Sequence, residues 1–171
     1  MIKIYQMNVS CIGTFKINNE AETKVFAEAV ASLSDVGDII CLFGDLGAGK
    51  TGFCRCFIRS LTSPKQEVPS PTYTLVQSYQ ITSQPNPIEI WHYDLYRTSA
   101  EDEVVELGIE DAFSDGIVLI EWPEKAIKLL PDKRLEIHFE FSKGFEERII
   151  TLRGPEKWQY LNIENGKGIS S

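Results

Sequence analysis

The octapeptide Gly44-Asp45-Leu46-Gly47-Ala48-Gly49-Lys50-Thr51 decides how this sequence folds. It matches G-x-x-x-x-G-K-T, the phosphate-binding loop, whose backbone N–H groups converge on phosphate oxygens at the start of a helix. An apolar run at 39–43 precedes it and predicts a buried strand, and a helical pattern follows at 50–61. Strand, glycine loop and helix in this order are the context that the motif requires.

Two residues of the octapeptide carry specific chemistry. In a phosphate-binding loop the lysine reaches the β- and γ-phosphates, and the hydroxyl residue after it binds Mg²⁺. Lys50 and Thr51 occupy these positions. The alternative is a glycine-rich turn without a ligand, which the flanking strand and helix disfavour. The sequence therefore predicts a nucleoside triphosphate site with a magnesium ion.

Length and composition predict one ordinary globular domain. The chain has 171 residues, so we expect a single phosphate-loop ATPase domain over 1–171, with 1–17 as an edge strand or loose leader and 160–171 as a loose tail. It has no apolar run long enough for a bilayer and no signal pattern at its start, which favours a cytoplasmic protein without membrane contact. A formal net charge of −8 argues against a broad surface for nucleic acid. With four cysteines and two histidines no zinc-ligand spacing is present, so reduced, mostly buried thiols are expected.

Hydrophobic periodicity and turn residues place the other elements. The pattern predicts an amphipathic helix at 20–33 capped by Asn18-Asn19, strands at 72–79, 88–94 and 117–120, a short helix from Ser99 to Gly108, and a hairpin of 135–141 with 148–152. These elements predict an α/β protein, a single-domain P-loop NTPase-like mixed β-sheet flanked by few helices, with a C-terminal β-hairpin.

Two carboxylates end predicted strands downstream of the loop. Asp94 ends the strand at 88–94, and Glu121 follows the apolar run at 117–120. Mg²⁺ prefers oxygen ligands, typically one or two carboxylates with waters and phosphates. Each acid alone is equally well explained as a helix cap or a solvated strand end, but together with Thr51 they favour a metal site.

The hydroxyl residues near the loop have two interpretations, whereas the nearby arginines have a structural one. Thr72 and Thr74 follow a stiff, proline-rich connection at 68–71 and would face a γ-phosphate or its attacking water, or would be ordinary strand residues. Arg55 and Arg59 lie on the polar side of the helix at 50–61, where Arg59 suits the helix dipole.

Four motifs in order resemble those of the TsaE family, the bacterial ATPase subunits for making threonylcarbamoyladenosine in tRNA. They are the octapeptide, Ser70-Pro71-Thr72-Tyr73-Thr74-Leu75-Val76, His92-Tyr93-Asp94-Leu95-Tyr96-Arg97 and Glu121-Trp122-Pro123. The resemblance covers residues 20–141, and the ordered set is far more specific than the phosphate loop alone.

The resemblance implies a cytoplasmic, Mg²⁺-dependent ATP hydrolase that works with the TsaB and TsaD subunits. The assembly would form threonylcarbamoyladenosine at adenosine 37 of tRNAs that read codons starting with A. The transfer chemistry would belong to the partners, and tRNA would be bound only indirectly, through the complex. ATP hydrolysis by this subunit would reset the assembly between turnovers.

Motif matching to the family also implies roles for single residues. The nucleotide-binding residues would be Glu20, Gly47, Ala48, Gly49, Lys50, Thr51 and Gly52. Thr51 and Glu121 would hold Mg²⁺, and Asp94 would be a further metal-site or water-orienting acid. Lys50, Asp94 and Glu121 are thus the expected catalytic residues. Trp122 would lie by the nucleotide or the partner surface.

The chain departs from the family pattern at two points. Gly52 stands where the family usually has a second hydroxyl, which loses a hydrogen bond to a charged phosphate, an interaction worth roughly 1.5–3 kcal/mol. The family's basic residue in the last hairpin has no clear counterpart, and Lys143 is the nearest candidate.

Two other functions remain compatible with a phosphate loop. A small-molecule kinase normally closes an arginine-bearing lid over the phosphates, but the arginines here are dispersed and no loop holds a pair. A nucleotide-sensing assembly module without useful turnover is the other alternative, which Gly52 keeps open. A GTPase is disfavoured because the sequence has neither an Asn-Lys-x-Asp nor an Asp-x-x-Gly signature.

Overall fold

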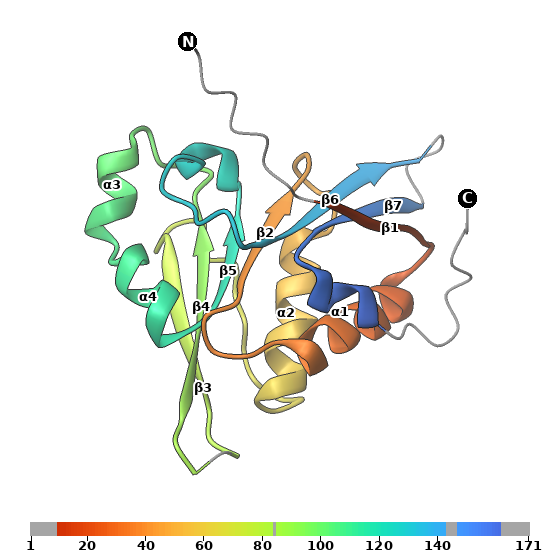
Figure 1. The fold of residues 1–171 in the computed structure, drawn as a ribbon, viewed down its shortest axis with the longest axis horizontal. Coiled ribbons are helices and arrows are strands. Elements are labelled where there is room, and N and C mark those ends of the chain that lie inside the picture. Colours follow the sequence, from red (N-terminus) through yellow and green to blue (C-terminus); the bar gives the residue numbers. More distant parts are fainter. Residues whose placement is uncertain (1–9, 84, 143–146, 162–171) are drawn as a thin grey trace.

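The strand that precedes the phosphate loop lies in the middle of a mixed sheet (Figure 1). The structure is a computed structural model that describes residues 10–83, 85–142 and 147–161. Within these ranges seven strands form one sheet in the order β1-β7-β6-β2-β5-β4-β3. The strands are β1 (Ser10–Ile17), β2 (Ile39–Phe43), β3 (Val76–Ile81), β4 (Ile88–Asp94), β5 (Gly116–Glu121), β6 (Leu135–Phe141) and β7 (Arg148–Gly154).

Strand direction brings the functional ends of the strands to one edge of the sheet. β2 is parallel to both β5 and β6, and β4 is parallel to β5, whereas β1, β3 and β7 run antiparallel to their neighbours. The register pairs Leu42 with Glu121 and Glu121 with Asp94. Both acids therefore lie at the same edge of the sheet as the start of the phosphate loop. The predicted α/β fold, with a mixed sheet and a C-terminal hairpin, is confirmed.

Helices cover the two faces of the sheet unequally. α1 (Glu20–Leu33) and α2 (Lys50–Leu61) pack together on one face, where Phe26, Phe53 and Phe57 lie in the larger core. α3 (Glu101–Glu106), α4 (Ile109–Asp115) and the 3-10 helix η1 (Pro123–Ala126) cover the other face beside β4 and β5. A last 3-10 helix, η2 (Glu156–Tyr160), buries Trp158 in the larger core.

Most predicted elements are confirmed. Both long helices have the predicted bounds, and the Asn19 side chain caps α1 by accepting a hydrogen bond from the Glu22 N–H at 3.0 Å. Of the predicted leader, Ser10–Ile17 is the edge strand β1, while residues 1–9 and most of the predicted tail, 162–171, lie outside the described residues. No helix in the described ranges is long and apolar enough to cross a membrane.

The strand predicted from Thr72 begins four residues later, so that prediction was wrong at its start. β3 begins at Val76, and residues 71–74 form a turn. The Leu75 N–H closes this turn by donating to the Pro71 carbonyl at 2.6 Å, with Leu75 itself left-handed at φ 65°. Closure of the turn overrides the strand propensity of threonine and tyrosine.

The helix predicted from Ser99 to Gly108 is confirmed as α3, and a second helix, α4, follows it directly. α3 begins after Ala100, and the Ser99 backbone N–H donates to the Glu103 carboxylate rather than Ser99 acting as a side-chain cap. Gly108, left-handed at φ 71°, ends the first helix and begins α4, which the sequence analysis missed. The left-handed turn lets α4 bury Ile109 against β5.

Replacing Gly44 with alanine is expected to lower the free energy of unfolding by about 1–3 kcal/mol. Gly44 has φ 137°, and a Cβ there would lie 2.5 Å from the Phe139 carbonyl oxygen. Urea denaturation followed by circular dichroism measures the change. Gly52→Ala is the matched control, because a Cβ at Gly52 meets nothing within 4 Å and the position is helical. The control should gain roughly 0.5–1 kcal/mol, and equal losses in both variants would contradict the steric argument.

Candidate nucleotide and metal site

The phosphate loop ends at an uncapped helix. β2 delivers the chain to Gly44, and α2 begins after Gly49, which has φ 114° and is followed directly by Lys50. No side chain caps this helix N-terminus. Its first-turn N–H groups therefore remain available to an anion, whose negative charge the helix dipole also stabilises.

Lys50 is held at the loop by contacts that phosphate oxygens could replace. Its side chain is buried, and its ammonium donates to the carbonyls of Gly44 and Asp45, the second at 2.9 Å. The same ammonium lies 4.0 Å from the centre of the Trp122 ring. Burial lowers the pKa of Lys50, while neighbouring carboxylates, Glu121 foremost, oppose that shift.

Trp122 takes an unusual backbone conformation to reach this position. It directly follows β5 and is left-handed at φ 58°, which is rare for a bulky side chain. Its ring also packs against Tyr96, with ring centres 4.9 Å apart. The strained turn thus aims an aromatic ring at the lysine of the phosphate loop, as strained residues at functional sites often do.

Both oxygens of the Glu121 carboxylate are engaged. The Thr51 hydroxyl donates to Oε2 at 2.8 Å, and His92 Nε2 lies 2.9 Å from Oε1. Glu121 is 2% exposed and His92 is fully buried. Because Nε2 faces a carboxylate, that nitrogen carries the proton, and His92 Nδ1 has no hydrogen-bond partner among the described residues. The adjacent Thr51 and Glu121 oxygens are hard donors that suit Mg²⁺.

The Asp94 carboxylate is fixed by the proline-rich connection. Thr72 Oγ1 donates to Asp94 Oδ2 at 2.8 Å, and the Tyr96 N–H donates to Oδ1 at 3.1 Å. Ser70 Oγ lies 3.4 Å from Oδ2. The turn at residues 71–74, which precedes β3, therefore directs the Thr72 hydroxyl to the Asp94 carboxylate. Thr74 is exposed in the same turn and lines neither of the two cavities described below.

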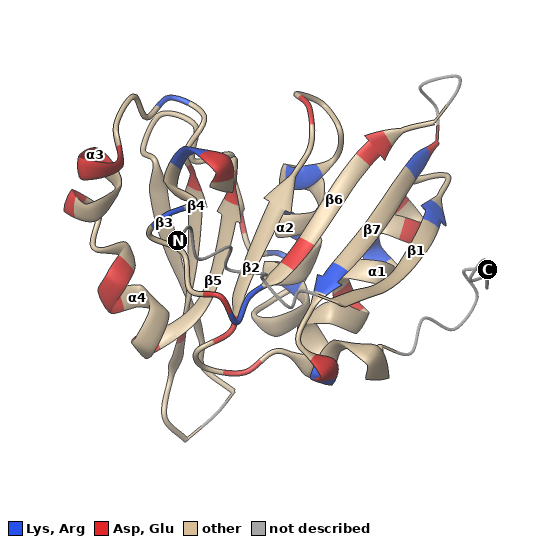
Figure 2. Ribbon diagram, turned by 45° about the horizontal axis from the view of Figure 1, so that its top comes forward, with Lys and Arg blue, Asp and Glu red and all other residues tan. Residues whose placement is uncertain are grey.

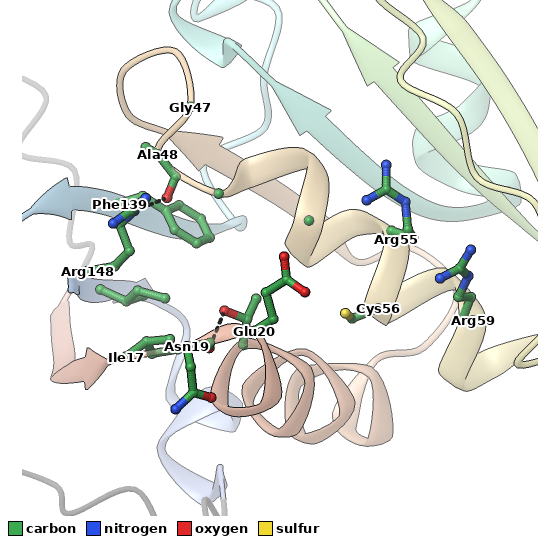
Figure 3. A pocket seen from close by; sticks show the side chains of 14 residues that line it. Ile17, Asn19, Glu20, Gly47, Ala48, Arg55, Cys56, Arg59, Phe139 and Arg148 are labelled. Carbon is green, nitrogen blue, oxygen red and sulfur yellow. Dashed lines mark hydrogen bonds between the residues drawn. The ribbon is translucent and has the colours of Figure 1, made fainter. Parts of the chain in front are cut away.

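Two cavities meet at the phosphate loop. The carboxylate cavity, of about 310 Å³, is lined by Lys50, Thr51, Thr72, Asp94, Glu121 and Trp122 among others. The arginine cavity, of about 440 Å³, is lined on its polar side by Glu20, Arg55, Arg59 and Arg148 (Figure 3). Gly47, Gly49 and Gly52 line both. An elongated ligand could therefore extend along the loop from one cavity to the other.

The predicted site residues divide between these cavities. Glu20, Gly47, Ala48, Gly49 and Gly52 line the arginine cavity, and Figure 3 shows the Glu20 carboxylate rising from α1 toward α2. The other predicted residues, Thr74 excepted, line the carboxylate cavity. Lys143, the candidate basic residue of the hairpin, lies outside the described residues.

Three arginines of the second cavity were not assigned to a site from the sequence. Arg55 Nε donates to the Val68 carbonyl at 3.2 Å, and Arg59 Nε donates to the Gln66 carbonyl at 2.9 Å. The spacing of Arg55 and Arg59 by one helical turn was the signal available for both. They tie α2 to the connection that leads to Thr72.

Arg148 contacts the phosphate loop from the far end of the chain. Its Nε donates to the Ala48 carbonyl at 3.1 Å, and its guanidinium stacks 4.3 Å from the centre of the Phe141 ring. Arg148 begins β7, and no local pattern connects it with a loop 100 residues earlier. Only the pairing of β7 with β1 and β6 brings it to the cavity wall.

A central parallel strand, a glycine loop with lysine and threonine, and two acid-tipped neighbouring strands define a phosphate-loop α/β protein with a nucleotide-binding fold. Comparison with known proteins then gives the family. The sequence model described as "Threonylcarbamoyl adenosine biosynthesis protein TsaE" matches residues 17–150, and the chain belongs to the TsaE family.

Individual relatives agree with this assignment. The chain is 41% identical over 124 residues to the tRNA threonylcarbamoyladenosine biosynthesis protein TsaE of Rickettsia felis, covering 72% of this chain and 70% of that protein. It is 38% identical over 135 residues to the protein of the same name from Bacillus subtilis, covering 78% and 80%. A crystal structure of Bacillus subtilis YdiB superposes with a TM-score of 0.68 at 30% identity, covering 85% of this chain and 86% of that one.

Proposed function

We propose that this protein is the ATP-hydrolysing subunit that acts with TsaB and TsaD to form threonylcarbamoyladenosine at adenosine 37 of tRNAs reading codons that start with A. Family membership gives the pathway, tRNA threonylcarbamoyladenosine biosynthesis. The observation that carries the ATPase proposal is the hydrogen bond of 2.8 Å from Thr51 to the buried Glu121 carboxylate, beside Lys50. A cytoplasmic location follows from a tRNA substrate.

The nucleotide is proposed to lie along the shared glycines. The arginine cavity, at about 440 Å³, is within the usual size of small-ligand pockets and would take the nucleoside. The phosphates would then follow Gly47 to Gly52 toward the carboxylate cavity. Thr51 and Glu121 would hold Mg²⁺, which when bound neutralises phosphate charge.

Three other residues of the carboxylate cavity, Lys50, Asp94 and Trp122, have roles under this proposal. Lys50 would exchange its loop carbonyls for phosphate oxygens, which places its positive charge where negative charge develops. Asp94 is held on both oxygens by Thr72 and the Tyr96 N–H, so it is fixed to orient a water or a metal-bound water. Trp122 would shield Lys50 from solvent or meet a partner subunit.

Surface charge supports an indirect contact with tRNA. Acidic side chains gather on α3 and α4, where Glu101, Asp102 and Glu103 occupy one first turn and Glu110 and Asp111 the other (Figure 2). The whole chain carries a formal net charge of −8. Such a surface repels a phosphate backbone, so the RNA is assigned to the partner subunits.

One reconstitution separates this proposal from a kinase and from an assembly module. The purified protein is mixed with TsaB, TsaD, Mg²⁺-ATP and unmodified tRNA together with the other substrates of the modification. Phosphate release without a small-molecule acceptor, and modified adenosine detected by mass spectrometry, are the expected results. A requirement for a phosphate acceptor would favour a kinase. ATP binding without phosphate release in the full mixture would favour the assembly module and overturn the proposal.

Replacing Gly52 with serine is expected to strengthen ATP binding about tenfold, since a hydrogen bond to a charged group contributes roughly 1.5–3 kcal/mol. The position has open space for a side chain and lines both cavities. Isothermal titration calorimetry measures the change. Gly52→Ala, which adds helix propensity without a hydroxyl, is the control. Equal affinities for the two variants would contradict a role for the hydroxyl.

A further inference from the structure

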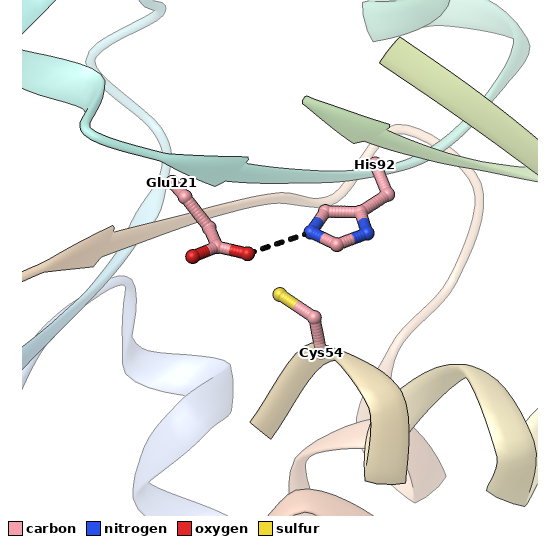
Figure 4. A group of neighbouring side chains, drawn as sticks. All are labelled: Cys54, His92 and Glu121. Atoms are coloured by element: carbon pink, nitrogen blue, oxygen red, sulfur yellow. Dashed lines mark hydrogen bonds and ion pairs between the residues drawn. The ribbon is translucent and has the colours of Figure 1, made fainter. Parts of the chain in front are cut away.

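Three different metal-ligating side chains converge between α2 and the sheet (Figure 4). Cys54 projects from α2, His92 from β4 and Glu121 from β5, and their ligand atoms lie within 4.8 Å of one another. Cys54 and His92 are fully buried, and Glu121 nearly so. The Cys54 thiol has no role in the proposed hydrolysis, and no sequence spacing predicted this cluster.

We propose that Cys54, His92 and Glu121 form a site for a soft divalent ion such as Zn²⁺, which competes with Mg²⁺ for the Glu121 carboxylate and so stops ATP hydrolysis. Thiolate and imidazole ligands select Zn²⁺, whereas Mg²⁺ selects oxygen, so the cluster and the proposed magnesium site differ in metal although they share Glu121. The inhibitory consequence rests on the proposed function, but metal binding itself does not.

Zinc binding requires only small shifts of the three side chains. A tetrahedral zinc site with bonds of roughly 2.0–2.3 Å has ligand atoms about 3.3–3.7 Å apart. His92 Nε2 and Glu121 Oε1 are 2.9 Å apart on adjacent strands, where His92 pairs with Leu119, so these two atoms would separate slightly to take an ion between them. A rotation of the Cys54 side chain would bring its sulfur closer to the other two ligand atoms. A water would complete the fourth position.

The charges of the three ligands suit a buried zinc ion. The thiolate of Cys54 would be the ligand, so Zn²⁺ binding releases one proton from the thiol to solvent. The resulting thiolate and the Glu121 carboxylate together balance the two positive charges of the ion. His92 would coordinate through Nε2, and its ring proton would then lie on Nδ1, which has no hydrogen-bond partner among the described residues.

An ion would reach the cluster from the nucleotide side. Thr51 and Glu121 line the carboxylate cavity, and Cys54 lies three residues after Thr51 on the same side of α2. Bound nucleotide would occupy this route. The nucleotide-free protein is therefore the form that should take up the soft metal.

Cobalt spectroscopy tests the site without relying on ATPase activity. Co²⁺ is titrated into the nucleotide-free full chain under reducing conditions, and a thiolate-to-cobalt charge-transfer band with visible bands of a four-coordinate ion is expected. Cys54→Ser and Cys54→Ala should lose the charge-transfer band, while Cys56→Ser, two residues away, should keep it. Thermal denaturation confirms that each variant is folded. No band in the wild type, or an equal band in the Cys54 variants, would overturn the proposal.

Zinc inhibition tests the consequence. Phosphate release by the complex with TsaB and TsaD is measured at fixed Mg²⁺-ATP over a range of Zn²⁺ concentrations. The Cys54→Ser complex should require at least about tenfold more Zn²⁺ for half-inhibition than the wild-type complex. Equal sensitivity would overturn the inhibitory role. A protein that hydrolyses no ATP would contradict the proposed function, while the cobalt spectrum would still decide the metal site.

Discussion

Lys50→Ala is expected to reduce ATP hydrolysis by at least about a hundredfold, since one preorganised donor to developing charge is typically worth that much. In the structure the Lys50 ammonium donates to two carbonyls of its own loop and lies over the Trp122 ring, and Lys50 lines the carboxylate cavity. Alanine removes this charge and leaves the loop amides in place. ATP affinity should fall as well, but less than turnover, because the uncapped N-terminus of α2 still binds phosphate.

The fold should survive this replacement. Burial lowers the pKa of Lys50, which means that its charged form is held in the protein at some expense. Without Lys50 the buried Glu121 and Asp94 carboxylates keep their hydrogen bonds to Thr51, His92 and Thr72, so neither is left without a polar partner. Lys65→Ala, at an exposed position, is the matched control and should keep wild-type turnover. Phosphate release and calorimetry measure the two variants, and wild-type turnover in Lys50→Ala would reject the phosphate-loop assignment of Lys50.

Local patterns were enough to predict the centre of this fold. The apolar run before Gly44, the glycine loop and the apolar side of α2 are contiguous in sequence, so their order dictates one parallel strand and one helix. Asp94 and Glu121 were predictable as neighbours for a related reason, because parallel strands end at the same edge of a sheet.

Other features depend on contacts that no local pattern contains. Arg148 meets Ala48 only because β7 pairs with its neighbours in one register. His92 reaches Glu121 because β4 and β5 lie side by side, and Cys54 joins them only when α2 packs on that face. Such long-range packing also explains the error at Thr72, whose turn is fixed by the contact with Asp94 rather than by strand propensity.

Replacing Glu121 with glutamine is expected to abolish Mg²⁺-dependent ATP hydrolysis while the fold is retained. Glutamine has the same shape, so its carbonyl still accepts from His92 Nε2, and its amide can donate to the Thr51 oxygen in place of the present bond. The variant therefore satisfies the same buried groups but lacks the negative charge that a magnesium ion requires. Turnover should fall by at least about a hundredfold.

Removing the negative charge of Glu121 also changes the pKa of Lys50. The Glu121 carboxylate opposes the lowering of the Lys50 pKa by burial, so its removal should lower that pKa further. A neutral lysine would then appear at a lower pH in the variant than in the wild type, and ATP affinity should decline with rising pH sooner. Calorimetry over a pH series detects this difference independently of turnover.

Glu124→Gln supplies the control that separates a ligand from a nearby charge. Glu124 is exposed on η1, three residues after Glu121, and it also acts electrostatically on Lys50. If Glu121 works as a magnesium ligand, Glu124→Gln keeps turnover and Mg²⁺ dependence, whereas Glu121→Gln loses both. If the two variants lose activity equally, the effect of Glu121 is only its field at Lys50. Wild-type turnover in Glu121→Gln would rule out the metal role of Glu121, and with it the functional reason for the hydrogen bond between Thr51 and Glu121 beside the loop.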